Sequence, residues 1–361
     1  MKIEAYSPTI RRKEMDAVLT AMVDGKIGPV DQAKLLVQAA REKIRFEHCL
    51  ALRSPVIALN MALKLLGIET GQGVILSALS PRYYSTVIEG LGLIPVYCDV
   101  HSSTTCISKE TVEKAITSKP AALELTCIVL HHSLGYLCDG PAIAELGLPI
   151  IEDCSQSFGS NSDGNPVGNA ASRAEFSILG LEERDMLGSG GGALLYSLNR
   201  RVSASQNLVQ KRNAGILTGD LPPEYGLPGM NAALAMVNLK EVEKRLLKRR
   251  EIAQLYTQSA LRTRHKRFIQ PDVLNQSVEY NNFAFALILE TGMKDVKAYG
   301  RRKEIAVENA FESTIIGSGL VQPETCPEAY SLSLRTVLFP IYPRLSMTDA
   351  GKVAKLIQTL P

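Results

Sequence analysis

The sequence predicts an α/β fold in which a mainly parallel sheet is covered by helices and followed by a smaller α+β part. Short, nearly continuous apolar segments rich in Val, Ile and Leu recur between residues 73 and 197, and such segments are typical of strands that are buried on both faces. Helix-like segments separate several of them, as in chains that build a parallel sheet through crossover helices. With 361 residues, the chain is long enough for one large domain and a second, smaller one.

The expected elements of the first part alternate along the chain. Helices are expected where helical patterns lie before or between the apolar segments, at 56–67, 109–116 and 142–146. Strands are expected at the apolar segments themselves, 73–79, 93–100, 123–132, 148–153, 175–179 and 192–197. Ligands of such sheets bind beyond the carboxyl ends of the strands, so the ends of 148–153 and 175–179 are the places to look for a site.

The pattern changes after residue 197. We expect a helix at 200–214, a loop rich in Pro and Gly at 219–229, and then a long helix that starts near Met230 and carries alternating charges. We place a domain boundary near residue 240, with the long helix bridging a large domain (1–240) and a small α+β domain (241–361). The small domain mixes helices with strands such as one at 281–289.

Charge and composition argue against several classes of partner. The net charge is only +3, so we expect no general attraction to nucleic acid or to an anionic membrane. Basic clusters at 244–251 and 262–267 are interpreted as the solvated face of a helix and its exit, with a polyanion-binding patch as the alternative. Residues 1–14 lack the apolar core of a signal peptide, and no stretch is long enough to span a bilayer, which predicts a cytoplasmic protein.

Cysteine and histidine spacing predicts no metal site. The seven cysteines are scattered without a CxxC pair, and most lie in apolar segments, where a buried free thiol is the simplest interpretation. His131 and His132 are adjacent at the end of a predicted strand. Their side chains therefore point to opposite faces and cannot easily share one metal ion.

The segment FSILGLEERDMLGSGGG (176–192) combines a strand, four charged residues and a glycine run. Glycines at such a place let the backbone approach a bound group closely. The charged residues Glu182, Glu183, Arg184 and Asp185 have two interpretations. Paired carboxylates near a cation can be pushed apart in pKa and serve as acid–base groups, but a solvated loop tip is the simpler prediction for most of the four.

A resemblance to a known family rests on the segment IIEDCSQSFGS (150–160). It resembles the VIEDAAQ-x-x-GA motif of the DegT/DnrJ/EryC1/StrS family, sugar aminotransferases with the aspartate-aminotransferase-like architecture (pyridoxal phosphate, PLP, fold type I). HHSLGYLCD (131–139) is similar to the family's V-H-x-x-G-x-x-x-D. Further segments resemble family motifs in the same order, namely 25–30, 46–75, 91–100, 176–195, 232–239 and 338–349. The resemblance covers nearly the whole chain and implies the fold.

The resemblance also implies a cofactor and three residues that would hold it. In this family PLP acts as an electron sink, and the protein binds it and tunes its ring. Asp153 stands where the family pairs an aspartate with the pyridine nitrogen. Gln156 stands where a glutamine packs near the phenolic oxygen, and Ser177 stands where a serine contacts the phosphate.

The phosphate-binding motif of the family is only partly kept. Ser54, Pro55 and Val56 align with its S-G-T, which binds phosphate at a helix N-terminus. Ser54 retains a hydroxyl group, whereas Pro55 removes a backbone donor and Val56 has no hydroxyl. A proline in the first turn is compatible with the helix, so we expect a helix with a weakened phosphate site.

Two other cofactor contacts of the family differ as well. The aromatic lid over the ring aligns near Pro81, for which Tyr83 or Tyr84 could substitute. The N-x-R that is contributed across the dimer aligns with Glu224 and Gly226, and an acidic side chain there would repel a phosphate.

The Schiff-base lysine of the family is replaced in this alignment. It falls on Glu182 when counted from the serine, or on Arg184 when counted back from the glycines, because the loop is two residues longer. Neither side chain can form an imine. No lysine occurs between Lys119 and Lys211, and Lys211 is expected to lie away from the site. No histidine, which a related dehydratase uses instead, occurs at 133–264.

Three hypotheses for the function follow from these agreements and differences. The favoured one is a degenerate family member, a pseudoenzyme or partner subunit in nucleotide-sugar and polysaccharide biosynthesis. The second is an enzyme of altered chemistry that acts on a nucleotide-linked keto-sugar with non-covalent PMP or no cofactor. The third is an ordinary PLP-dependent sugar aminotransferase whose lysine comes from a remote position or another chain.

The expected partners are the same for all three hypotheses. We expect a homodimer, with a heterodimer containing an active paralogue as the alternative, and a small ligand resembling a nucleotide sugar. PLP or PMP would bind non-covalently at best, and the absence of any cofactor is also compatible with the sequence.

Overall fold

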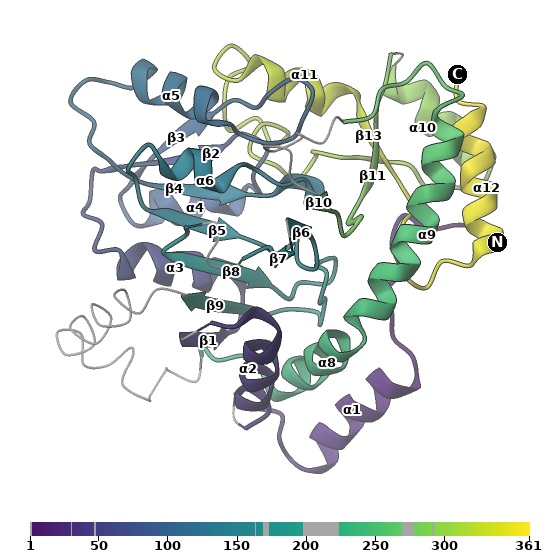
Figure 1. The fold of residues 1–361 in the computed structure, drawn as a ribbon, viewed down its shortest axis with the longest axis horizontal. Helices are drawn as coiled ribbons and strands as arrows, with labels where there is room; N and C mark the ends of the chain where they lie inside the picture. Colours follow the sequence, from purple (N-terminus) through teal and green to yellow (C-terminus); the bar gives the residue numbers. More distant parts are fainter. Residues whose placement is uncertain are drawn as a thin grey trace.

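A seven-stranded sheet forms the centre of the molecule (Figure 1). The computed structural model describes residues 2–29, 31–46, 48–162, 164–168, 173–197, 224–268, 278–290 and 292–361. The sheet has the order β1-β9-β8-β5-β4-β2-β3. Its strands are β1 (His48–Leu52), β2 (Gly73–Ser77), β3 (Ile94–Cys98), β4 (Leu125–His131), β5 (Ile150–Asp153), β8 (Phe176–Gly180) and β9 (Ala193–Ser197).

The sheet is mainly parallel, as the sequence predicts. Strands β3, β2, β4, β5 and β8 run parallel, and β9 is antiparallel to both of its neighbours, β8 and β1. Every residue of β2, β5, β8 and β9 is buried, which explains their continuous apolar pattern. All six expected strands are present. The edge strand β1 was missed because most of its residues are only partly buried and its pattern is interrupted.

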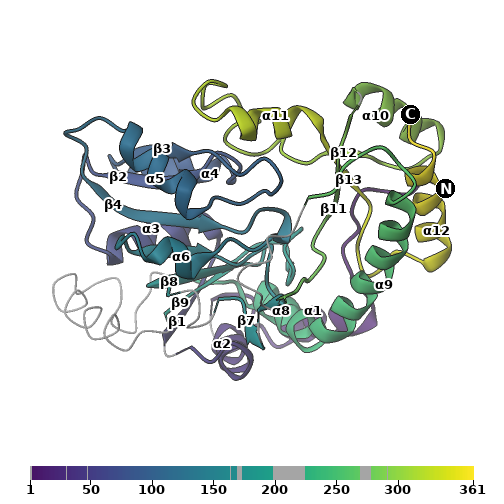
Figure 2. The same ribbon diagram turned by 45° about the horizontal axis from the view of Figure 1, so that its top comes forward.

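Helices lie on both faces of this sheet (Figure 2). The expected helices correspond to α3 (Pro55–Leu65), α5 (Lys109–Ser118) and α6 (Gly140–Ala144). Ser54 caps α3 by accepting a hydrogen bond from the Ile57 amide at 3.3 Å, with Pro55 in the first turn. An additional helix, α4 (Tyr83–Gly90), follows β2 and was not expected from the sequence.

The C-terminal part packs beside the sheet and is connected to it by two helices. These are α8 (Gly229–Lys240) and α9 (Val242–Ala260), so the expectation of one continuous helix was wrong at Glu241, where the helix breaks. A small antiparallel sheet has the order β11-β13-β12, with β11 (Phe285–Ile288), β12 (Glu308–Asn309) and β13 (Thr336–Phe339). It is accompanied by α10 (Met293–Arg302), α11 (Pro327–Arg335) and α12 (Met347–Gln358). The strand expected at 281–289 is thus shorter than predicted.

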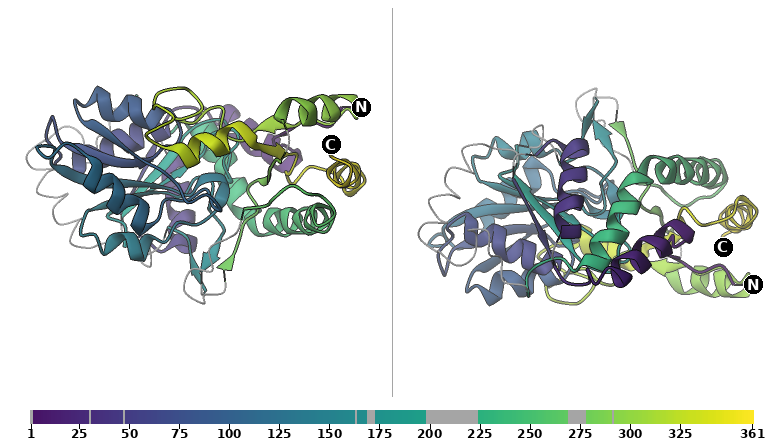
Figure 3. Two further views of the ribbon diagram at one scale, coloured as in Figure 1. Left: turned by 90° about the horizontal axis from the view of Figure 1, so that it is seen from above. Right: turned by 90° about the horizontal axis from the view of Figure 1, so that it is seen from below.

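The remaining elements lie at the periphery. Helices α1 (Arg12–Val23) and α2 (Asp31–Ile44) precede the sheet and pack against α8 (Figure 3). Strands β6 (Asn161–Ser162), β7 (Asn165–Pro166) and β10 (Val278–Glu279) form a second small sheet. No helix in the described ranges has the length and apolar composition needed to cross a membrane. The helix expected at 200–214, Lys211, and the first part of the loop expected at 219–229 lie outside the described residues.

The start of the chain packs against the C-terminal part. The Ile3 amide donates to the Glu304 carbonyl at 2.8 Å, and the Ala306 amide donates to the Ile3 carbonyl at 2.9 Å. Ile3 is buried in the same apolar cluster as Ile252, Val307 and other C-terminal residues. Both termini lie on the side of the molecule formed by the C-terminal part, next to α12 (Figure 1). The domain boundary near residue 240 stays a prediction.

Arg249 connects α9 to the backbone at residues 282–283 and at residue 341. The side chain is buried, and its Nη1 donates to the carbonyls of Asn282 (3.2 Å), Phe283 (2.9 Å) and Ile341 (2.9 Å). Burial lowers the pKa of Arg249 to about 10, so the guanidinium remains charged at neutral pH. A buried cation whose bonds go to backbone carbonyls holds those backbone segments at fixed positions.

Arg249→Ala is expected to lower the free energy of unfolding by about 3 kcal/mol or more, because buried carbonyls lose a charged donor. Arg250→Ala is the matched control. Arg250 is the next residue on the helix but forms an exposed ion pair with Glu279, so its loss is expected to cost less than about 1 kcal/mol. Urea unfolding followed by circular dichroism measures both. Equal losses in the two variants would contradict the connecting role of Arg249.

Candidate functional site

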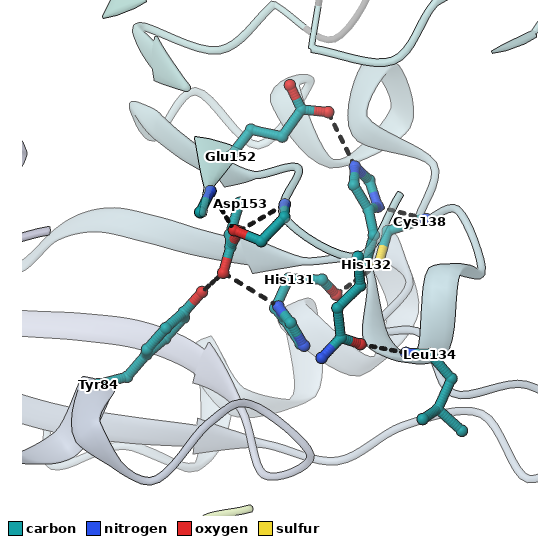
Figure 4. A network of polar contacts seen from close by, with 10 residues as sticks. Tyr84, His131, His132, Leu134, Cys138, Glu152 and Asp153 are labelled. Carbon is teal, nitrogen blue, oxygen red and sulfur yellow. Dashed lines mark hydrogen bonds and ion pairs between the residues drawn. The ribbon is translucent and has the colours of Figure 1, made fainter. Parts of the chain in front are cut away.

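The carboxyl ends of the central parallel strands bring two acid–histidine pairs together. His131 ends β4 and Asp153 ends β5, and the two residues are direct partners in the parallel ladder. Neighbouring side chains on a strand point to opposite faces. His131 therefore meets Asp153 on one face of the sheet, and His132 meets Glu152 on the other (Figure 4). All four side chains are buried.

Asp153 is surrounded by donors from its own chain. Its Oδ1 accepts the backbone amide of Ser155 at 2.9 Å and also the Ser155 hydroxyl. Its Oδ2 accepts the phenol of Tyr84, and Nδ1 of His131 lies 3.3 Å from the same oxygen (Figure 4). Asp153 is only 2% exposed and Tyr84 only 1%, so this carboxylate is enclosed by protein.

Ionisation of the two main partners follows from these contacts. Burial alone would raise the pKa of Asp153, but the close approach of His131, with hydrogen bonds from Ser155 and Tyr84, lowers it to about 2. Burial and the negative charge of Asp153 raise the pKa of Tyr84 well above its usual value. At neutral pH Asp153 is therefore a carboxylate, and Tyr84 is a protonated phenol that donates to it.

The second pair has a structural role on the opposite face. Nδ1 of His132 accepts the Cys138 amide at 3.1 Å, so the ring proton resides on Nε2 and is donated to Glu152 at 2.8 Å. The hydroxyl of Ser177 lies 3.5 Å from the other oxygen of Glu152. The expectation that the two histidines face opposite ways is confirmed. Within the ranges that the structure describes, no group of three or more His, Cys, Asp or Glu side chains could hold a metal ion.

The other residues expected at a cofactor site are not gathered around Asp153. Ser177 is buried on the Glu152 side of the sheet, and the Ser54 hydroxyl caps α3. The Gln156 amide oxygen accepts the Leu134 amide at 2.7 Å. Tyr83, the first residue of α4, packs edge-on against Tyr84 with ring centroids 4.8 Å apart. Of these four residues, Tyr83 is the one that contacts a direct partner of Asp153, namely Tyr84.

The residues aligned with the family's aromatic lid and N-x-R motif form backbone contacts with other segments of the chain. Pro81 pairs with Thr314 in an isolated antiparallel bridge, and Gly226 pairs in the same way with Leu52. The Glu224 carbonyl accepts Nε of Arg53 at 2.8 Å. These segments hold the ends of α3 and α4 in place.

The glycine run closes the loop at 181–192 on itself. Gly190, Gly191 and Gly192 have φ angles of 79°, 141° and 123°, which other residues rarely adopt. This backbone lets the amides of Ser189 (2.9 Å) and Gly191 (3.1 Å) both donate to the Leu181 carbonyl. A Cβ on Gly192 would lie 2.3 Å from a methyl carbon of Leu227. Gly192 therefore serves close packing against Leu227, whereas Gly190 and Gly191 are required by their backbone conformation.

Asp185 is the one charged residue of this loop that turns inward. Its Oδ2 accepts the Glu182 amide at 2.8 Å and lies 2.3 Å from where a Cβ on Gly180 would be. Burial and the nearby charge of Asp153 raise the pKa of Asp185 to about 8. Asp185 is therefore largely protonated at neutral pH, while Asp153 is ionised. Two neighbouring carboxyl groups in opposite states are an arrangement that can hold and release a proton.

The two positions that align with the family lysine face elsewhere. Arg184 donates to both carboxylate oxygens of Glu308 on β12, at 2.7 and 3.2 Å, and lies over the Tyr6 ring. Glu182 is exposed. Glu182, Glu183 and Arg184 are thus solvated, as expected for most of the loop, whereas Asp185 is only partly exposed.

Cofactor fit can be tested on Asp153 itself. A carboxylate offers about four acceptor positions, and here Ser155 uses two on Oδ1 and Tyr84 uses one on Oδ2, while Nδ1 of His131 lies 3.3 Å from Oδ2 without hydrogen-bond geometry. A pyridinium N–H could therefore reach Oδ2 only in place of Tyr84 or between Tyr84 and His131. The residues present therefore do not fit PLP or PMP at Asp153 as they stand.

The sequence pattern did not predict that four residues lie around Asp153. Tyr84 was only an alternative to Tyr83, His131 was considered only as a metal ligand, Ser155 was not singled out, and Asp185 was weighed as part of a solvated tip. A usable signal was present for His131, since both it and Asp153 end predicted parallel strands. Which strands are neighbours had to come from the sheet order.

Comparisons with known proteins place these features in context. The sequence profile of the DegT/DnrJ/EryC1/StrS aminotransferase family matches residues 8–358. The chain is similar to an L-glutamine:2-deoxy-scyllo-inosose aminotransferase of Streptomyces lividus, with 30% identity over 247 residues, 66% of this chain and 55% of the relative. It is also similar to a GDP-perosamine synthase of Vibrio cholerae, with 27% identity over 229 residues, 60% of this chain and 59% of the relative. The chain thus spans little more than half the length of these curated relatives.

Solved structures agree over the whole chain. An aminotransferase of Streptoalloteichus hindustanus superposes with a TM-score of 0.84 at 19% identity and covers 99% of this chain and 98% of its own. A Streptococcus pneumoniae protein, described as the PMP form of a sugar aminotransferase, gives a TM-score of 0.86 at 18% identity over 99% and 97%. The aminotransferase fold expected from the sequence is confirmed.

Asp185→Asn is expected to change how stability depends on pH. A carboxyl whose folded pKa of about 8 exceeds its ordinary value of 3.8 stabilises the fold fully below pH 3.8, and this contribution is lost as pH rises toward 8. Asparagine can still accept the Glu182 amide but has no charge to bury. The variant should therefore gain stability relative to wild type from pH 4 to pH 8, as measured by urea unfolding.

The control for this experiment is Glu183→Gln, which removes a charge from an exposed side chain of the same loop. Its stability difference from wild type should stay nearly constant over the same range. A flat difference for Asp185→Asn would show that Asp185 is ionised in the folded protein.

Proposed function

The chain belongs to the DegT/DnrJ/EryC1/StrS aminotransferase family, and from that premise we propose a specific role within it. Members of this family use PLP or PMP and act on nucleotide-linked sugars. We propose that this chain binds a ligand of the same class, a nucleotide-linked keto-sugar, and does not perform lysine-dependent transamination on its own. It would act as a binding or partner subunit in the biosynthesis of amino sugars or surface polysaccharides.

The observation that supports this proposal most is the state of the two positions that align with the Schiff-base lysine. Arg184 is engaged by Glu308 in a two-point ion pair, and Glu182 faces solvent. A guanidinium is protonated and delocalised and a carboxylate is no amine, so neither can form an imine. Asp153, the residue expected on the pyridine nitrogen, already accepts three hydrogen bonds from Ser155 and Tyr84, and Nδ1 of His131 lies 3.3 Å from its Oδ2.

The phosphate contacts support the same proposal. Ser54 uses its hydroxyl to cap α3, and Pro55 has no amide hydrogen to offer an anion. Ser177 is buried beside Glu152. These side chains stabilise the protein's own helices and strands, which is the role that remains when a binding site loses its ligand.

A second candidate function is favoured by the comparisons. The matched relatives are named as an aminotransferase and a perosamine synthase, so amino transfer to a keto-sugar is the alternative. It requires a lysine from another part of this chain or from a partner chain. An altered reaction of the Asp153 and Asp185 pair with non-covalent PMP belongs to the same alternative.

The proposal includes a dimer, formed either by two copies or with an active paralogue. One face of α1 carries exposed apolar side chains at helical spacing, namely Met15, Leu19, Met22 and Val23, with 52%, 55%, 54% and 82% exposure. A contiguous apolar stripe on a surface helix is typical of an interaction site. In a heterodimer, this chain could hold the partner's site in shape.

Covalent capture of PLP tests the main proposal. The pure protein is incubated with PLP, reduced with borohydride, digested and analysed by mass spectrometry. We expect no stoichiometric adduct on any single lysine, whereas a relative that retains the motif lysine should be labelled at that residue. A stoichiometric adduct at one site would overturn the proposal and identify a substitute for the missing amine.

The same protein preparation should be assayed for amino transfer from glutamate to a nucleotide-linked keto-sugar. Turnover without a second protein would establish the alternative function. Turnover only after addition of an active paralogue, above the level of that paralogue alone, would support the role of partner subunit.

Leu19→Glu is expected to weaken the dimer, because it places a charge in the middle of the apolar stripe of α1. Thr20→Glu is the control: it adds the same charge to the next exposed position of the helix. Light scattering after size exclusion should give a monomer mass for Leu19→Glu and a dimer mass for wild type and Thr20→Glu. A dimer mass for all three proteins would place the interface elsewhere.

A further inference from the structure

We propose that Tyr84 takes the place of a cofactor ring, closing the pocket in front of Asp153 from within the chain. The phenol donates to Oδ2 of Asp153, the carboxylate that the family pairs with a pyridinium N–H. Tyr84 would explain why no cofactor binds at Asp153. The inference rests on the proposed function only in taking Asp153 as the cofactor site. It predicts that the closed pocket opens when the tyrosine side chain is removed.

The position of Tyr84 is fixed by its helix and by a second segment of the chain. The turn between β2 and α4 is bonded to residues 313–316: the Arg82 amide donates to the Ser313 carbonyl (3.2 Å), and the Ile315 amide donates to the Ser80 carbonyl (3.0 Å). This turn sets where α4 begins and therefore where the Tyr84 side chain projects. The C-terminal part of the chain thus helps to hold Tyr84 against Asp153.

The ring of Tyr84 is packed as a core residue. It lies edge-on to Tyr83, with centroids 4.8 Å apart, and edge-on to His131, with centroids 5.9 Å apart. Edge-to-face contacts of this kind are favourable, and the side chain is 1% exposed. A ligand ring can reach Asp153 only if Tyr84 leaves this packing and loses its hydrogen bond, so the apparent affinity falls with the fraction of open molecules.

His131 is a second side chain of this sequence that lies against the Asp153 carboxylate, beside Tyr84. The family motif V-H-x-x-G-x-x-x-D has valine at the position of His131, which cannot contact a carboxylate through a polar atom. Here Nδ1 of His131 lies 3.3 Å from Oδ2, the oxygen that Tyr84 also uses (Figure 4). Two side chains of this sequence therefore converge on one carboxylate oxygen. A buried carboxylate without a ligand needs such partners.

Binding of PMP tests the closed pocket. PMP carries an amine in place of the aldehyde, so it cannot form an imine with any lysine and reports on the pocket alone. Calorimetric titration with PMP is carried out on the full chain for wild type, Tyr84→Ala, Tyr84→Phe and Tyr97→Ala. Tyr97 is the matched control, a partly buried tyrosine on β3 whose hydroxyl contacts Ser85 at 3.3 Å and does not contact Asp153.

We expect Tyr84→Ala to bind PMP at least about tenfold more tightly than wild type, and this gain should disappear in Tyr84→Ala/Asp153→Asn. Tyr84→Phe should remain closed because the ring is still present, and Tyr97→Ala should behave like wild type. A gain in Tyr84→Phe equal to that in Tyr84→Ala would mean that the hydrogen bond, and not the ring, excludes the ligand, and it would overturn the proposal.

Two further measurements keep the proposal testable if Tyr84→Ala folds poorly. Phenol has the shape of the group that Tyr84→Ala deletes and should raise the melting temperature of Tyr84→Ala more than that of Tyr97→Ala. PMP binding by unmodified wild type that is lost in Asp153→Asn would overturn the proposal whatever the variants do. A covalent PLP adduct on a lysine would overturn the proposed function but not the closed pocket, which the PMP titrations test separately.

Discussion

The arrangement of the site follows from the need of one buried carboxylate for partners. Asp153 is 2% exposed at the end of a central strand, and an ionised carboxylate at such a place is stable only with several donors. Ser155 supplies two of them from the turn that follows β5, Tyr84 supplies a third from α4, and Nδ1 of His131 at the end of β4 lies 3.3 Å from the carboxylate. The helix after β2, the end of β4 and the turn after β5 are therefore held relative to one another through a single side chain.

The C-terminal part of the chain contributes to the same region from outside. Arg184 joins the loop at 181–192 to Glu308 on β12. Asp99, just after β3, accepts the amides of Glu328 (3.0 Å) and Ala329 (2.8 Å) at the start of α11. Since α11 precedes β13 of the small sheet, these contacts fix how the small sheet lies against the large one. The C-terminal part therefore contributes to the positions of the segments that surround Asp153.

Membership of a family and the chemistry of a site are separate matters. The fold of the relatives is kept from end to end. Three positions that contact the cofactor in the family's motifs contact protein groups here. Ser54 caps α3, and Gln156 accepts the Leu134 amide. The Ser177 hydroxyl lies beside Glu152. A buried polar side chain needs a hydrogen-bond partner, and at these positions the partner is the protein itself.

The sequence by itself determined the fold class and the positions of six strands along the chain, and it predicted the departures from the family pattern at Glu182, Arg184 and Pro55. These are local properties: apolar continuity, residue type and spacing along the chain. Only the tertiary structure decided that Tyr84 and His131 meet at Asp153 and that Asp185 turns inward, because these contacts depend on which strands are neighbours and on where α4 begins. The break at Glu241 and the packing of Ile3 against the C-terminal part were likewise decided by contacts between segments far apart in sequence.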